Sequence, residues 1–155
     1  MFSAFLPDVR RAARAPAYAS LALSLLLAGA GPTAASEDDT TILNTGKTIL
    51  SQPFAYPTGA PAKVTVSVIT LKPGDERGWH KHEVPLLGYV LDGELTIDFG
   101  KLRTKVFRKG DAFVEAIDTA HNGRNLGKED VRLLAVFMGA DGSDNTARPS
   151  GPPPQ

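Results

Sequence analysis

The 155-residue sequence contains no cysteine. This absence excludes disulfide bonds, thiolate metal ligands, a cysteine nucleophile and a lipid-modified cysteine after a leader. The sequence also has no net formal charge, because lysine and arginine together number 17, as do aspartate and glutamate. Residues 1–35 hold three of the arginines and one of the aspartates, which leaves residues 36–155 with 14 basic and 16 acidic side chains. No excess of basic charge therefore favours a nucleic-acid partner.

The sequence has no apolar run long enough to span a bilayer comfortably. The longest, residues 17–30, is interrupted by two serines and falls short of the ~20 residues that a spanning helix needs. It follows Arg10 and Arg11 and precedes a group of small residues, which is the order of a secretory signal peptide. We expect residues 1–35 to be removed and the mature protein to be periplasmic or secreted, with no membrane attachment. An uncleaved single-pass anchor is the alternative.

Beyond this leader no segment has the 3.6-residue spacing of an amphipathic helix, and apolar residues instead alternate with polar ones. The valines of KVTVSVITL (63–71) share one face of a strand with threonine and serine on the other, whereas VRLLAVFMG (131–139) is apolar on both faces, as in a central strand. Further strands are expected within residues 41–46, 94–100, 103–107 and 112–116.

Turn signals rich in glycine and aspartate separate these segments, as in KPGD (72–75), LDGE (91–94) and RKGD (108–111). Short strands with turns at this spacing predict an all-β sandwich or small barrel. We expect an N-terminal strand and loop over residues 36–61 and one barrel over residues 62–139. Residues 140–155 are polar and rich in glycine and proline, which predicts a disordered tail.

The chain has only three histidines, and two of them lie one residue apart in GWHKHEVPLLGYVLDGEL (78–95). Alternate side chains of a strand share a face, so His80 and His82 should project together and form half of a metal site. His121 follows 39 residues later, after another predicted strand, and a barrel can bring it against the first two. For each histidine taken alone, a surface or hydrogen-bonded structural role is the alternative.

The surroundings of these histidines resemble the two sequence motifs of the cupin superfamily. The first motif is Gly, five residues, His-x-His, three or four residues, Glu, six residues, Gly. The second is Gly, five residues, Pro-x-Gly, two residues, His, three residues, Asn. The matching residues are Gly74, His80, His82 and Gly93 for the first motif, and Gly110, His121 and Asn125 for the second.

The resemblance covers about residues 62–139 and implies a single jelly-roll β-barrel. It also implies that His80, His82 and His121 bind one divalent transition metal, for which Fe, Mn, Zn, Cu and Ni all remain open. In the second motif the sequence departs from the family, because Ala116 and Asp118 replace the proline and the glycine.

A second departure concerns the fourth ligand of the family, a glutamate. Its position falls at Leu86, or at Leu87 with the longer spacing, and neither residue can bind a metal. Glu83 can replace it if a bulge turns its side chain toward His82, and Glu115 can do so if its strand edge faces inward. A solvated surface carboxylate is the alternative for both.

Three neutral imidazoles leave the charge of a divalent ion uncompensated, so the site should attract a small anionic ligand. Tyr89 and Arg77 are the predicted catalytic residues: the phenol can donate to a bound anion, and Arg77 or Arg124 can clamp a carboxylate. A core aromatic and exposed loop arginines are the alternatives.

The resemblance implies an exported metal-dependent oxidoreductase of the dioxygenase type, or a lyase, acting on a small oxygen-rich anion. A non-catalytic module that binds a metal or a small ligand is the second possibility, and a metal-free barrel is the third. The resemblance also implies a homodimer. Residues 40–50, TTILNTGKTIL, are expected to be a strand that pairs with the neighbouring subunit, because an unpaired edge needs protection.

Overall fold

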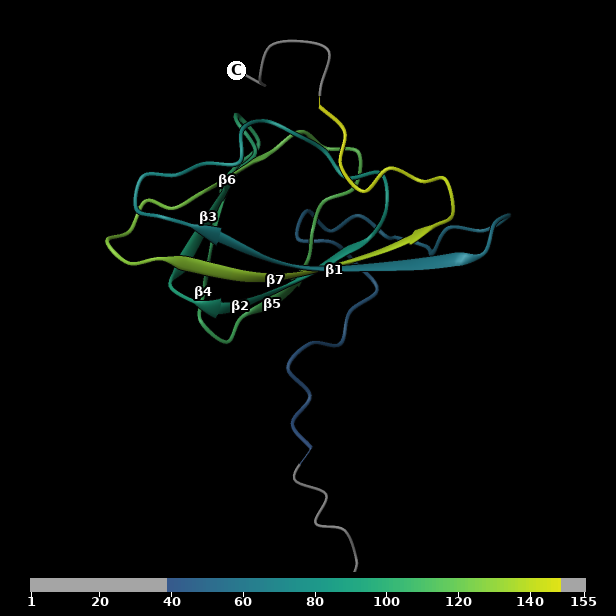
Figure 1. Ribbon diagram of the computed structural model, residues 1–155, viewed down its shortest axis with the longest axis horizontal. Coiled ribbons are helices and arrows are strands. Elements are labelled where there is room, and N and C mark those ends of the chain that lie inside the picture. Colours follow the sequence, from purple (N-terminus) through teal and green to yellow (C-terminus); the bar gives the residue numbers. More distant parts are fainter. Residues whose placement is uncertain (1–38, 149–155) are drawn as a thin grey trace, which may run out of the picture. The chain divides into compact units, whose positions relative to one another are not determined.

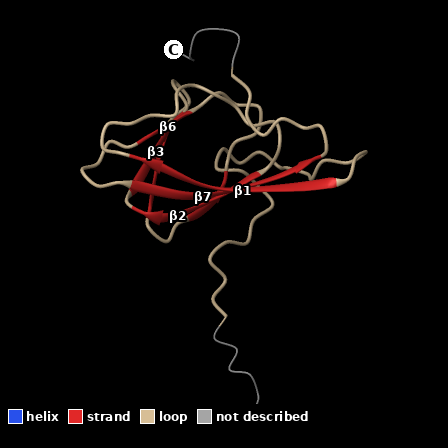
Figure 2. Ribbon diagram, in the orientation of Figure 1, coloured by secondary structure: helices blue, strands red, loops and turns tan. Residues whose placement is uncertain are grey.

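The structure, a computed structural model, describes residues 39–148 of the chain, so the predicted signal peptide lies outside the described residues. This part contains seven β-strands and no helix, and hence no helix that could cross a membrane (Figure 2). The strands are β1 Ala62–Leu71, β2 Leu86–Asp92, β3 Glu94–Asp98, β4 Thr104–Arg108, β5 Ala112–Val114, β6 Asn122–Arg124 and β7 Val131–Ala140.

The strands form two antiparallel sheets, which confirms the predicted all-β class (Figure 1). One sheet has the order β1-β7-β2-β5 and the other the order β4-β3-β6. The ten residues of β1 pair with all ten of β7, and the other side of β7 pairs with β2. The segment that is apolar on both faces is therefore central in its sheet, as a strand with neighbours on both edges should be.

The hairpin between β2 and β3 depends on Gly93. Its φ of +76° lies in the left-handed region that favours glycine. A Cβ atom at this position would also stand 2.5 Å from the carbonyl oxygen of Asp130. The DG signal in the sequence thus marks a turn in which both backbone conformation and close packing require glycine.

The core between the sheets is built from large aliphatic and aromatic side chains. Phe99 and Val90 are fully buried, and the partly buried Ile49 and Leu50 pack against the same cluster. Its buried members are Leu71, Val90, Leu95, Ile97, Phe99, Phe113, Ala116 and Val131.

The valines of β1 lie on the outer face of the sheet. Val64, Val66 and Val68 are 62%, 60% and 52% exposed, because Ile69 and Leu71 pack inward and set which alternate residues face the core. The face with more polar residues therefore points inward over most of β1, and an apolar face points outward.

The segment predicted as an N-terminal strand differs from that expectation. Residues 40–46 form no strand, and Lys47 makes only an isolated bridge with Pro53. The amide of Ile49 donates to the carbonyl of Val114, so this end of the segment bonds to β5 of its own chain. Its apolar residues Ile49 and Leu50 fill the chain's own core, which is the physical reason that they are not an exposed pairing edge.

The prediction of a disordered tail from residue 140 onward is wrong for residues 141–148. Ser143 closes a turn onto Ala140, and Lys81 and Ala147 then exchange both backbone hydrogen bonds at 2.9 Å. The backbone hydrogen bonds with Lys81 order a segment whose composition alone cannot form a core. Residues 149–155 of the predicted tail lie outside the described residues.

Candidate metal centre

The three histidines meet because two loop segments pair directly. His80 and His121 exchange both backbone hydrogen bonds at 2.9 Å, which makes them opposite partners of an antiparallel bridge. The carbonyl of His82 accepts from the amide of Asp118 and extends the contact by two residues. Directly opposite residues place their side chains on the same side, so His121 joins the pair that the sequence already predicts.

The three imidazole rings face one another across a small space. Their centroids are 4.5–5.0 Å apart, and one ligand nitrogen from each ring lies within 4.8 Å of the others. Two nitrogens on one tetrahedral ion stand roughly 3.4 Å apart when the bonds are about 2.1 Å. Small ring rotations therefore suffice to place all three nitrogens on one ion.

Backbone carbonyls orient every ring. The Nδ1 atoms of His80, His82 and His121 lie 2.7, 2.8 and 2.9 Å from the carbonyl oxygens of Gly78, Asn145 and Thr119, respectively. A carbonyl can only accept, so each Nδ1 carries the proton and each Nε2 keeps its lone pair. This arrangement holds three metal-binding nitrogens in the required tautomer.

Burial keeps these rings neutral. It lowers the pKa of His82 to about 4 and that of His121 to about 3. Burial also lowers the pKa of His80, and the positive charges of Arg77 and Arg148 act in the same direction. Neutral imidazole is the form that binds a transition metal.

One atom of the site is an unsatisfied acceptor. Nε2 of His121 is buried without a hydrogen-bond partner in the described residues, and the His121 side chain is only 2% exposed. Leaving such an atom unpaired costs about 1–3 kcal/mol. A metal ion satisfies this lone pair, so the residues present fit the metal that the cupin resemblance implies.

Glu115 lies in the same cavity. Its Oε2 is 3.8 Å from Nε2 of His121, and its Oε1 accepts a 3.0 Å hydrogen bond from the amide of Ala116. Burial raises the pKa of Glu115 to about 8, so at neutral pH both groups are uncharged and their contact is not an ion pair. The alternative of a solvated carboxylate is therefore wrong for Glu115.

Glu83, the other candidate for a fourth ligand, lies on the surface. Its carboxylate pairs with Nζ of Lys81 at 3.2 Å and is half-exposed. Glu83 lies in a bend after His82 and does not line the space between the histidines. It lines a separate surface hollow with Pro85 and Asp118.

The histidines line one wall of a cavity of about 50 Å³, which we call the histidine cavity. This volume accommodates a hydrated ion or a ligand of a few heavy atoms. Glu115 and Thr146 line it as well, and the remaining wall is largely aliphatic. Its apolar residues include Ile69, Leu71, Leu86, Ile97 and Leu133.

The two predicted catalytic residues have different positions. Arg77 lines the histidine cavity, and its side chain is exposed. Tyr89 does not reach the cavity. It lies on β2 between the inward-facing Gly88 and Val90, opposite Ala112 of β5 and Leu134 of β7. Alternate residues of β2 are buried, and Tyr89 belongs to the other set, so its side chain points away from the predicted site.

Two further residues near the histidines have structural surroundings. Arg124 forms surface ion pairs with Glu76 and Asp98 at 3.4 and 3.8 Å. The buried amide of Asn125 donates to the carbonyls of Leu71 and Glu129 and so closes the loop after β6. Neither residue lines the histidine cavity.

Sequence reasoning missed the contribution of residues 145–148. The carbonyl of Asn145 orients His82, Thr146 lines the cavity, and Arg148 lies beside His80. No local motif signals this role, because it arises only when the segment pairs with Lys81.

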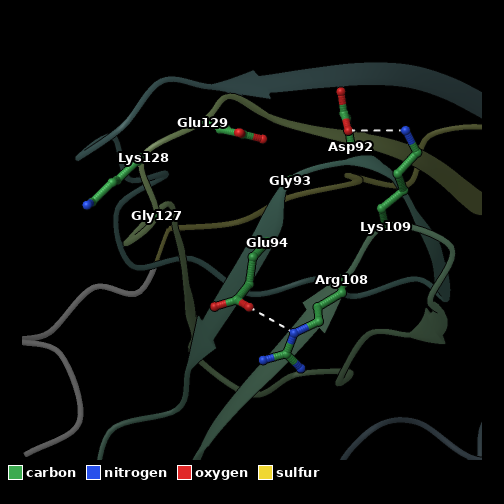
Figure 3. Close-up of a pocket in the computed structure, with 8 residues that line it drawn as sticks. All are labelled: Asp92, Gly93, Glu94, Arg108, Lys109, Gly127, Lys128 and Glu129. Carbon is green, nitrogen blue, oxygen red and sulfur yellow. Dashed lines mark hydrogen bonds and ion pairs between the residues drawn. The ribbon is translucent and has the colours of Figure 1, made fainter.

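A larger hollow of about 560 Å³ lies elsewhere, between the β2–β3 and β4–β5 turns and the loop after β6 (Figure 3). In this charged hollow the carboxylates of Glu94 and Asp92 pair with Arg108 and Lys109 at 3.0 and 3.4 Å. It contains no histidine, and its side chains are largely exposed. Its lining residues are Asp92, Gly93, Glu94, Arg108, Lys109, Gly127, Lys128 and Glu129.

The family of the chain follows from its central region. Residues 67–137, which hold all three histidines, match the cupin domain family. These residues form a domain of the cupin superfamily. Comparison with curated proteins finds no match.

Several solved structures are similar to this cupin. Oxalate decarboxylase of Lactobacillus farciminis, solved as a formate complex, is 23% identical with a TM-score of 0.48, over 55% of this chain and 26% of that one. DMSP lyase DddQ of Ruegeria pomeroyi is 18% identical with a TM-score of 0.49, over 57% and 45%. A Klebsiella pneumoniae protein with a double-stranded β-helix domain is 21% identical with a TM-score of 0.48, over 68% and 86%. The cupin thus spans less than half of the decarboxylase and of the lyase.

Proposed function

We propose that this cupin binds one divalent transition metal through His80, His82 and His121 and acts as an oxidoreductase or lyase on a small, oxygen-rich anion. The observation that carries the proposal is the convergence of three neutral imidazoles, each with its Nδ1 bonded to a carbonyl and its Nε2 free. A histidine that served only the core would use both nitrogens in hydrogen bonds. The buried Nε2 of His121 has no such partner.

A bound ion of this kind polarises an oxygen of its ligand and acidifies bound water. The chain provides the surroundings for that chemistry. Aliphatic side chains exclude bulk water from the histidine cavity, and the carboxyl group of Glu115 offers an oxygen ligand or a proton close to His121. Iron, manganese, zinc, copper and nickel all suit such a donor set.

An anionic ligand is supported by the charges of the cavity. The three imidazoles and Glu115 are neutral near pH 7, and the charged group among the lining residues is the guanidinium of Arg77. A carboxylate would therefore meet only attractive charge in this cavity. The volume of about 50 Å³ restricts the ligand to a few heavy atoms.

A non-catalytic metal-binding or ligand-binding module is the second candidate. The observation in its favour is Leu86, which stands where the cupin motif has a glutamate and lines the histidine cavity with a methyl-bearing side chain. A site without that carboxylate depends on Glu115 for an oxygen ligand, and Glu115 comes from a different strand.

Metal analysis of the purified full chain tests the proposal. We expect one equivalent of metal after reconstitution in the wild type and only traces in His121→Ala. The control is Thr96→Ala, which removes a buried hydroxyl of β3 outside the cavity. Oxygen uptake and product analysis with small hydroxy and keto acids, enediols and thiols then separate the two candidates. Turnover that His121→Ala abolishes supports the enzyme, metal without turnover supports the binding module, and a wild type that holds no metal contradicts both.

We propose further that the cupin is exported. The support is the basic, apolar and small-residue order of residues 1–35. Cell fractionation and N-terminal sequencing of the mature protein test this proposal, with a start near residue 36 as the expected result. A cytoplasmic protein with an intact N-terminus would contradict it.

A further inference from the structure

The C-terminal segment 141–148 docks at the mouth of the histidine cavity. The backbone pair between Lys81 and Ala147 holds it against the segment that carries His80 and His82. The carbonyl of Asn145 orients His82. Thr146, between Asn145 and Ala147, lines the cavity. The next residue after the backbone pair is Arg148.

Arg148 lies beside the loop that begins the histidine pair. Gly78 has a φ of +72°, and a Cβ atom built there would stand 3.4 Å from Nη1 of Arg148. The carbonyl of Gly78 is also the partner of His80 Nδ1, so Arg148 packs against the residue that orients the first histidine.

Two guanidinium groups thus flank the cavity, Arg77 within its lining and Arg148 on the segment above. Across residues 39–148 neither has a carboxylate within ion-pair distance, whereas Arg108 and Arg124 each have one. Unpaired positive charge beside a neutral cavity is the arrangement of an anion-binding site.

We propose that Arg77 and Arg148 together bind a carboxylate group of the ligand, so that the C-terminal segment completes the site. This inference rests on the proposed function. A planar guanidinium pairs with a carboxylate through two parallel hydrogen bonds, and a small dicarboxylate can reach from the arginines to the histidines. Arg148 is thereby a residue that binds the ligand, and Asn145 is a positioning residue for His82.

The test uses the full chain loaded with Co²⁺, whose visible absorption reports ligand binding at the metal. Oxalate is the probe, titrated into the wild type, Arg148→Gln and Arg77→Gln. Arg132→Gln, on the outer face of β7, is the control. We expect each of the first two variants to weaken oxalate binding roughly ten-fold or more, with unchanged Co²⁺ content, since hydrogen bonds to charged groups contribute about that much.

The outcomes separate this inference from the proposed function. Unchanged oxalate affinity in Arg148→Gln with Co²⁺ bound overturns the inference and leaves the metal site intact. A wild type that takes up no Co²⁺ contradicts the proposed function, and calorimetry of oxalate with the metal-free chain then decides the inference alone. If the metal-free wild type binds oxalate and Arg148→Gln does not, the carboxylate site is supported. If the metal-free wild type does not bind oxalate, the inference is overturned.

A separate observation concerns the outer face of the sheet β1-β7-β2-β5. Val64, Val66 and Val68 are more than half exposed there and lie opposite Met138, Val136 and Leu134 of β7 in the strand register. Leu87 and Tyr89 of β2 continue the same face. The outward side chains of this apolar face are Val64, Val66, Val68, Leu87, Tyr89, Leu134, Val136 and Met138.

The face of an antiparallel sheet that points to water normally carries polar residues, whereas this one carries apolar residues. The charged side chains that share its register, Arg132 and Asp92, are paired at one end of the face. With a rise of ~3.3 Å per residue and a strand spacing of ~4.8 Å, ten residues of three neighbouring strands give the face an area of about 500 Å². Two copies packed face to face would bury about 1,000 Å², which is the lower bound for a specific interface.

We infer that the apolar face binds a second copy of this chain about a twofold axis. An uncharged face of this kind is complementary to itself, which satisfies the requirement of an isologous interface. The homodimer expected from the cupin resemblance would then form through the outer face of β1 and β7 rather than through residues 40–50.

Sedimentation of the full chain tests this interface. We expect a dimeric wild type, a monomeric Val66→Asp variant and a dimeric Val106→Asp control, in which the substituted valine is exposed on β4 of the other sheet. Circular dichroism verifies that each variant is folded. A Val66→Asp variant that remains dimeric, or a wild type that is monomeric at all concentrations, overturns the inference.

Thiol labelling of Val66→Cys adds a second readout, because the chain has no other cysteine. Protection that disappears on dilution supports a second copy. Protection independent of concentration shows that another part of the same chain covers the face, and free labelling at high concentration shows that nothing covers it. Both of these results contradict the dimer.

Discussion

The histidine cavity and the charged hollow differ in every property that matters for chemistry. The hollow is about ten times larger and contains more charged side chains, but the carboxylates of Glu94 and Asp92 are exposed and paired with Arg108 and Lys109. The cavity is small, and burial moves the pKa of Glu115 up and those of His82 and His121 down. Desolvation and convergence, and not size or charge, therefore identify the functional site.

The largest difference between the two regions should appear in metal affinity. Loss of a residue that only supports a metal ligand lowers metal affinity by up to about 100-fold. His82→Ala removes a ligand itself, so we expect metal affinity to fall by more than roughly 100-fold. Glu129→Ala, in the charged hollow, should leave it unchanged. Competition with a chromophoric chelator measures both. Equal loss in the two variants would contradict the assignment.

Acid should destabilise the metal-free protein through the cavity alone. The unfolded chain protonates its imidazoles near pH 6.5, whereas folded His82 and His121 remain neutral down to about pH 4 and 3. Stability is fully present above pH 6.5 and is lost as the pH falls through the folded pKa values, by about 2–3 kcal/mol for each ring at pH 4. Urea unfolding of Glu115→Gln with a chelator present measures this loss without the opposite contribution of Glu115. A flat profile of this variant from pH 7 to 4 would show that the rings are not desolvated.

Glu115 should have the opposite pH dependence. Its folded pKa is about 8, above the unfolded value of 4.5, so the stability linked to it is present below pH 4.5 and lost as the pH rises through 8. Glu115→Gln keeps the acceptor for the Ala116 amide and removes this loss. We expect the metal-free variant to be more stable by on the order of 2 kcal/mol at pH 8. Glu94→Gln in the hollow is the matched control, and an equal gain there would refute the explanation by burial.

The smallest effect is expected in the hollow itself. Glu94 and Arg108 form a 3.0 Å pair, and both side chains are largely exposed to water. A double-mutant cycle of Glu94→Ala and Arg108→Ala should give a coupling free energy below about 0.5 kcal/mol that decreases with salt. A coupling above 2 kcal/mol would remove the contrast with the cavity.

Much of the fold was predictable from local patterns. Alternation placed β1, β3, β4, β5 and β7 near their observed bounds, and glycine turns separated them, because both signals depend on neighbouring residues. The three histidines were predicted together from their spacing and the cupin motifs. β6, which has three residues and no alternation, was not predicted.

The positions of side chains relative to the core were less predictable. Tyr89 was assigned to the site and lies on the outer face, whereas Glu115 was left open between the site and the surface and lies in the cavity. Both outcomes have the same cause. Alternation says which residues share a face, but only packing against the second sheet decides which face is inside.

Asp118 illustrates how a departure from the motif is tolerated. It stands where the cupin motif has a glycine and adopts a φ of 51°. Aspartate visits this left-handed region more readily than most residues, and its carboxylate pairs with Lys81 at 2.8 Å. The backbone of the motif is thus preserved without its glycine.

The sequence by itself determined the longer alternating strands, the glycine turns and the pairing of His80 with His82, because these follow from backbone periodicity and from residues with special conformations. Only the tertiary structure decided the distance of His121 from that pair, the burial of Glu115 and the docking of residues 141–148. These three features depend on hydrogen bonds and desolvation between segments far apart in the chain, which no local pattern encodes.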